Sequence, residues 1–133
     1  MALTDFFLST EKAVTKIGAK GVPDSLPRFQ TKDFHVVQLE RLGEMLGSGG
    51  GVDDGEPIVH GDDFEWMVMG VSNPLVHAIA ILSDDDAKKH GMAIARTDEL
   101  HWPATDGIKV LLELRELAKH AKDGTRLWVW VST

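Results

Sequence analysis

The stretch DGIKVLLELRELAKHAKDGTRLWVWVST, residues 106–133, decides how this chain folds. Its first half has apolar residues at helical spacing, which predicts an amphipathic helix with Thr105 or Asp106 as its N-cap. Asp123-Gly124 ends that helix, because glycine adopts the left-handed conformation of a helix end at little cost. The apolar positions of the helix are Ile108, Leu111, Leu112, Leu114, Leu117, Ala118 and Ala121.

The second half of the stretch, residues 126–132, alternates as a strand does. Leu127, Val129 and Val131 fall on one face, and Trp128 and Trp130 fall on the other. Two interpretations follow. An internal strand would bury both faces, whereas an edge strand would leave the two tryptophans as a partner surface, since tryptophan dominates binding hot spots.

Four further helices are predicted upstream, over residues 10–17, 36–46, 73–82 and 84–97. For the second, Asp33 or His35 is the candidate cap and Gly47 the end. Pro74 suits the first turn of the third. Ser83 can cap the fourth, whose three leading aspartates suit the positive end of the helix dipole.

Extended structure is predicted at residues 28–34 and for two short strands, 57–60 and 64–69, around the turn Gly61-Asp62-Asp63. Both faces of 64–69 are apolar, which is typical of a strand inside a sheet. We therefore expect an α+β fold. It would be a single domain over 1–133, with a small mixed sheet of four to five short strands and about five packed helices. The glycine-rich segment 47–56 is expected to be a flexible loop.

Composition narrows the function classes. The chain has 133 residues, no cysteine and a net charge of −7. Disulfides, thiolate zinc sites and cysteine nucleophiles are thereby excluded, and a cytoplasmic location is expected. The negative charge disfavours nucleic acid, and no apolar run is long enough to predict a membrane span.

Two sets of candidate site residues emerge. The first is a partner surface made of acidic loop residues and the tryptophan face: Asp53, Asp54, Asp62, Asp63, Trp128 and Trp130. The second is a catalytic or ligand pocket in which His60, Asp62 and Asp63 meet His101 and Trp102, since histidine and carboxylates are the usual acid–base groups.

The motifs of common cofactor sites are missing from the sequence. There is no HExxH helix, and the glycine run lacks the lysine of a Walker loop and the register of an EF-hand. We therefore expect no cofactor and no metal site.

The segments PRFQTK (27–32), LERLGEMLG (39–47) and RLWVWVST (126–133) resemble pieces of a family of small uncharacterised bacterial proteins. About a third of the chain carries the resemblance. It implies a bacterial cytoplasmic protein and brings no catalytic residues.

Taken together, the sequence predicts a non-enzymatic domain that binds a protein partner, of which immunity- and antitoxin-like proteins are one class. The alternative is a small metal- or ligand-binding enzyme using His60, Asp62, Asp63 and His101. A third hypothesis is a homo-oligomer built by pairing of the C-terminal strands.

Overall fold

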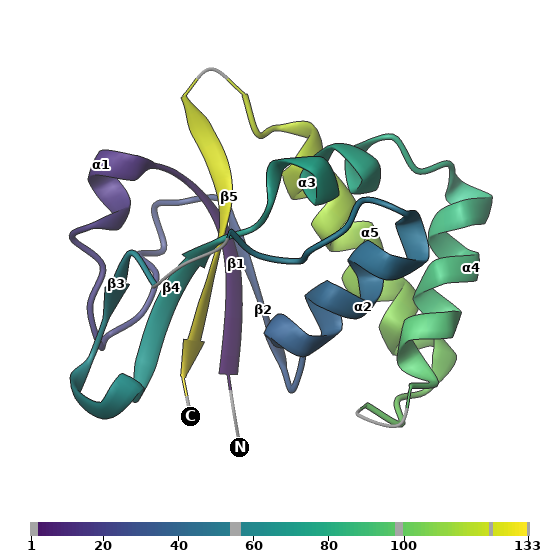
Figure 1. The fold of residues 1–133 in the computed structure, drawn as a ribbon, viewed down its shortest axis with the longest axis horizontal. Coiled ribbons are helices and arrows are strands. Elements are labelled where there is room, and N and C mark those ends of the chain that lie inside the picture. The colour runs from purple at the N-terminus through teal and green to yellow at the C-terminus, as the bar shows by residue number, and fades with distance from the viewer. Residues whose placement is uncertain (1–2, 54–56, 98–99, 123, 133) are drawn as a thin grey trace.

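The computed structural model describes residues 3–53, 57–97, 100–122 and 124–132. These residues form one α+β domain around a five-stranded sheet with the order β2-β1-β5-β4-β3 (Figure 1). The strands are β1 (Leu3–Thr10), β2 (Arg28–Lys32), β3 (Val59–His60), β4 (Trp66–Gly70) and β5 (Thr125–Ser132). The helices are α1 (Glu11–Val14), α2 (Val36–Leu46), α3 (Asn73–Ala80), α4 (Asp84–Ala95) and α5 (Ala104–Lys119), with a 3-10 turn η1 (Asp62–Phe64).

The C-terminal strand β5 is the centre of the sheet. It pairs along its whole length with β1 on one side, and residues 128–132 pair with β4 on the other. Its predicted alternation is confirmed: Leu127, Val129 and Val131 belong to one buried cluster, and Trp128 and Trp130 to a second cluster on the opposite face. Because every strand has only antiparallel neighbours, the sheet is antiparallel throughout rather than mixed.

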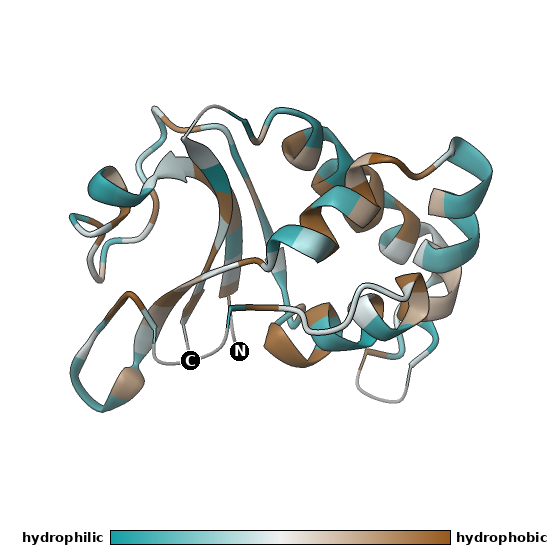
Figure 2. Ribbon diagram, turned by 45° about the horizontal axis from the view of Figure 1, so that its top comes forward, coloured by the Kyte–Doolittle hydropathy of each residue, from teal (hydrophilic) through white to brown (hydrophobic). Residues whose placement is uncertain are grey.

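The two faces of the sheet are covered unequally. Of the described elements, the helices α2, α3, α4 and α5 lie on one side, and α1 and the loop that follows it lie on the other (Figure 1). The larger cluster joins Phe6 and Leu8 of β1 to Leu39, Ile79 and Leu114 of the helices. Hydrophobic colour lines the strands, and the outer turns of the helices are largely hydrophilic (Figure 2).

The predicted helices all form, but α1 covers only Glu11–Val14 of the predicted 10–17, and α3 and α4 end two residues early. His35 is the N-cap of α2 and Gly47, with a φ of 72°, is its C-cap. Ser83 caps α4 by accepting from the Asp86 amide. The predicted caps of α5 are wrong, because the helix already begins at Ala104 after Pro103, without a side-chain cap.

Strand β1 was not predicted as a strand. It places Thr4, Asp5 and Ser9 among its buried residues, and these polar side chains hide the apolar pattern. Its pairing with β5 joins residues more than a hundred positions apart, and no local signal announces such a contact.

The glycine run is packed rather than a flexible loop over residues 47–53. Gly51 is buried, and its carbonyl accepts from the Ser72 amide at 3.1 Å. The Asp53 amide donates to the Gly70 carbonyl at 2.9 Å. A Cβ on Gly51 would lie 2.6 Å from the Glu40 nitrogen of α2, so the glycine allows the loop to approach the helix backbone.

None of the helices in the described ranges combines the length and the apolar character needed to cross a bilayer.

Candidate functional site

The β3–β4 hairpin turns through residues 61–65, called here the acidic hairpin. The Gly61 amide donates to the Trp66 carbonyl at 2.9 Å, and the Phe64 amide donates to the Gly61 carbonyl at 3.2 Å. A Cβ on Gly61 would lie 2.3 Å from Nε1 of Trp66, so only glycine fits beneath that ring. The predicted turn is confirmed, and its backbone is closely defined.

The backbone of the acidic hairpin is strained at its apex. Asp63 and Phe64 are consecutive residues with φ values of 51° and 55°. Aspartate tolerates this left-handed region, but it is costly for a bulky side chain. Phe64 is nevertheless there, 49% exposed, and its ring stacks on His60 with the centroids 4.3 Å apart. The fold thus presents an aromatic ring to solvent in an unfavourable conformation.

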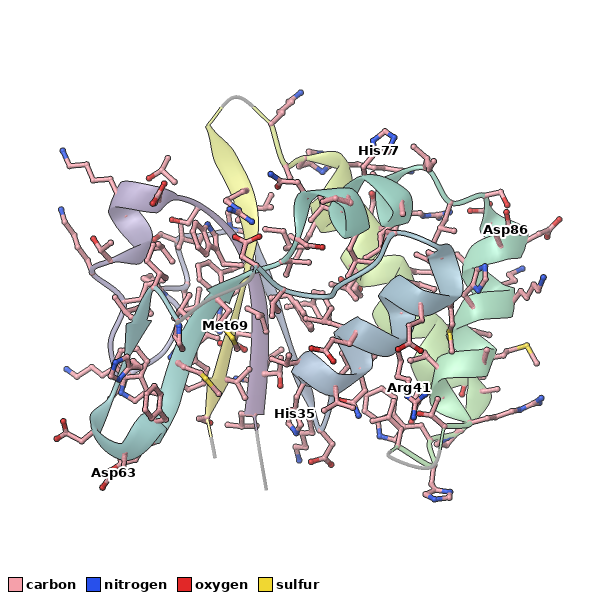
Figure 3. All side chains as sticks on the ribbon, in the orientation of Figure 1. His35, Arg41, Asp63, Met69, His77 and Asp86 are labelled. Atoms are coloured by element: carbon pink, nitrogen blue, oxygen red, sulfur yellow. The ribbon has the colours of Figure 1, made fainter. Side chains whose placement is uncertain are left out.

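Two carboxylates directly precede this ring in the chain. Asp62 and Asp63 are both exposed, and Asp63 points away from the protein at the lower left (Figure 3). The same hairpin is largely hydrophilic, with a short hydrophobic piece at its turn (Figure 2). An aromatic side chain between carboxylates is suited to a basic surface with an apolar hollow.

A comparable pairing of apolar and acidic residues occurs at the start of α4, but the fold explains it. Ile81 is 69% exposed and precedes three aspartates in the first helical turn. The helix dipole stabilises those carboxylates, and Asp84 also accepts a hydrogen bond from Arg115 at 2.8 Å. These acidic residues therefore have a role in the helix itself, whereas Asp62 and Asp63 lie in an exposed turn.

The catalytic alternative is not assembled in this structure. His60 lies on the edge strand β3, whereas His101 follows α4 at the opposite end of the molecule (Figure 1). Five surface hollows are well formed among the described residues, and their linings include neither histidine and neither Asp62 nor Asp63. Within the same ranges, no group of three His, Asp or Glu side chains could hold a metal ion.

Trp102 does line a groove, but with other partners. The groove, about 390 Å³ in volume, runs between β2 and α5, with Phe29, Lys32 and Val110 among its walls. Trp102 is half-buried and lies 6.0 Å from the ring of Phe34, so it closes one edge of the larger core. His101 beside it is exposed, with a φ of 51°.

Asp53, in the loop after the glycine run, is held by contacts within the protein. Asp53 forms an ion pair with Arg126 at 2.9 Å, and Arg126 also donates to the Val71 carbonyl and lies over the Trp128 ring. Asp53 thereby ties the glycine-rich loop to the sheet and is a poor candidate for a partner surface. Asp54 lies outside the described residues.

The tryptophan face is not a surface. Trp128 and Trp130 are only 3% and 6% exposed, and Nε1 of Trp128 donates to the Ser9 carbonyl at 2.9 Å. The edge-strand interpretation is therefore wrong, because β5 has neighbours on both sides. For the same reason, the C-terminal strands cannot pair between copies of the chain.

No protein-family model, curated protein or solved structure matches this chain. The resemblance to small bacterial proteins stays a prediction, and function has to be argued from the site itself. The residue that sequence reasoning missed is Phe64, which the alternation placed on a strand face with Trp66 and Val68. The available signal was its position between acidic residues on both sides.

Proposed function

We propose that this chain is a non-enzymatic protein-binding domain whose acidic hairpin docks on a basic surface of a partner protein. The observation that carries the proposal is Phe64, half-exposed at a φ of 55°. Left-handed backbone costs about 1–2 kcal/mol at a residue with a side chain. The ring stacks on His60, yet about half of the residue stays exposed to solvent.

The chemistry of the hairpin specifies the partner. An aromatic anchor inside a polar rim is the usual form of a binding hot spot. Asp62 and Asp63, together with the net charge of −7, favour a partner that is positively charged around an apolar hollow. Immunity- and antitoxin-like proteins, which neutralise a basic partner through an acidic surface, are a class that fits this description.

The test begins with capture from the source cells by the tagged chain, followed by identification of the captured protein. Binding of that protein, once purified, is then measured by calorimetry with the wild type and with Phe64→Ala. A hot-spot ring contributes about 2 kcal/mol or more, so the variant should bind roughly 30-fold more weakly. Phe64→Gly removes the same ring and suits the left-handed backbone, so it separates loss of binding from misfolding.

Matched variants test the role of charge. Asp62→Asn with Asp63→Asn should slow association and weaken its dependence on salt. Asp85→Asn with Asp86→Asn makes the same change in charge at the start of α4, and should leave binding unchanged. Equal loss in both pairs would mean that only the overall charge matters. Full affinity in both Phe64 variants, or an acidic partner, would overturn the proposal.

A further inference from the structure

A second candidate site lies on the other side of the sheet from the large helices. It is a pocket of about 520 Å³ between β1, β2, β5 and the loop after α1. Asp5 and Trp130, directly opposite one another on paired strands, contribute to its lining. Gly21, with a φ of 90°, brings the loop against the Trp130 ring. The pocket is thus built partly on rigid sheet positions.

Two polar atoms of this pocket lack partners among the described residues. They are Oδ1 of Asp5 and Nε1 of Trp130, which belong to side chains that are 2% and 6% exposed. The other carboxylate oxygen of Asp5 accepts from Arg28 at 3.0 Å. Burial raises the pKa of Asp5, although Arg28 and, more weakly, Gln30 lower it. Buried donors and acceptors are rarely left unpaired in folded proteins, so this pair calls for an explanation.

The two atoms need opposite hydrogen-bond partners, one a donor and the other an acceptor. A carboxylate oxygen accepts a hydrogen bond, and an indole N–H donates one. A hydroxyl group can satisfy both at a single oxygen, because it is at once a donor and an acceptor. An amine lacks this ability when it is charged, and a carboxylate would oppose Asp5. A hydroxyl therefore matches both atoms of the pocket floor.

The charge of the pocket also limits the ligand. Its lining holds two acidic side chains, Asp5 and Asp24, and two basic ones, Lys20 and Arg28. Arg28 bridges both carboxylates, so no strong field of either sign favours a charged ligand. Gln30 and Lys20 are exposed polar groups at the mouth, where further hydroxyls could bond. An uncharged ligand with several hydroxyl groups matches this set.

We propose that the pocket between Asp5, Trp130 and the loop at residues 20–24 binds a small uncharged polyhydroxylated molecule, such as a monosaccharide or polyol, with one hydroxyl between Asp5 and Trp130. Both floor atoms are shielded from solvent, so a ligand reaches them when the side chains around them shift. The site is independent of the acidic hairpin, and either proposal can fail without the other.

The indole N–H of Trp130 provides a direct reporter. The chain has four tryptophans, whose indole signals are separate probes in a ¹H–¹⁵N spectrum, and Trp130→Phe assigns one of them. Titration with D-ribose, D-glucose and glycerol should shift the Trp130 signal in a saturable way with at least one of them. Sodium phosphate, whose negative charge opposes Asp5, should not saturate it.

Variants then locate the site. In Asp5→Asn, the amide oxygen is held by Arg28 and the NH₂ group takes the place of Oδ1, so the apparent affinity should fall at least tenfold. Gln30→Ala, at the exposed mouth, gives a second test if Asp5→Asn is unfolded. Asp84→Asn is the matched control on a distant helix. Non-saturable shifts with all three hydroxylated probes, unchanged affinity in the pocket variants, or a long-lived water alone at the Trp130 N–H would each overturn the proposal.

Discussion

Replacing Gly51 by alanine tests whether the glycine run is a packed element or a flexible loop. The Gly51 backbone is outside the left-handed region, so alanine can adopt it without conformational strain. The obstacle is space: the new Cβ would lie 2.6 Å from both the Glu40 nitrogen and the Leu39 carbonyl carbon. These are backbone atoms of α2 and cannot rotate away.

The expected magnitude follows from two opposing effects. Alanine reduces the freedom of the unfolded chain, which stabilises a protein by about 0.4–1 kcal/mol where the native site accepts it. Overpacking against fixed neighbours costs about 1–3 kcal/mol. Gly50 is the matched control, because a Cβ there meets nothing closer than the Val52 carbonyl oxygen at 3.8 Å. Gly50→Ala should be neutral or stabilising, and Gly51→Ala destabilising.

Urea unfolding of the wild type and both variants measures the difference. The midpoint of Gly51→Ala should fall with an unchanged m-value, since the surface exposed on unfolding stays the same. A flexible loop would instead give both variants the same small stabilisation. If Gly51→Ala is as stable as Gly50→Ala, the packing of residues 47–53 against α2 is refuted.

Three further changes have expected outcomes. Asp5→Asn should raise the free energy of unfolding at pH 7, because burial raises the pKa of Asp5 and stability is lost as pH rises through that value. The advantage should disappear below pH 3.8, where both states of the wild type hold the proton, and urea titrations at the two pH values check this. Asp84→Asn should lower stability at neutral pH and not in strong acid, because Arg115 lowers the pKa of Asp84, and its contribution is lost as pH falls through the lowered value. Phe6→Ala, at a fully buried ring, should cost about 3–5 kcal/mol in thermal or urea unfolding.

Local sequence patterns predicted where the helices and strands lie better than they predicted which elements lie side by side. The helix over 36–46 and its ending at Gly47 follow from spacing and glycine alone. The alternation at 126–132 also predicted two apolar faces, but an internal strand and a tryptophan-bearing edge have the same pattern. The choice between them depends on β1, which pairs with β5. Its residues Thr4 and Asp5 are buried although they are polar, so the sequence did not indicate a buried strand there. Long-range pairing of this kind is settled by the whole chain.

The site followed the same division. Acidic residues at 62–63 were correctly placed in a turn, whereas the exposure of Phe64 depends on two left-handed residues that no spacing rule predicts. His60 and His101 illustrate the opposite error, because suitable residue types suggested a meeting that the topology prevents. Residue types identify side chains that could do chemistry, and the fold decides which of these side chains lie at one site.

The unequal cover of the sheet gives both proposals a common physical basis. The helical side buries the larger cluster under four helices, and Asp84 on its surface is held in an ion pair with Arg115. Among the described residues, the opposite side is covered by the four-residue helix α1 and the loop that follows it. A thin layer opens locally at lower free energy than a packed one, and binding elements are drawn from such regions. The acidic hairpin borders this layer and the Asp5 pocket lies within it. Partner and ligand binding should therefore reduce amide hydrogen exchange in β3, the hairpin and the loop after α1, with little change in α5.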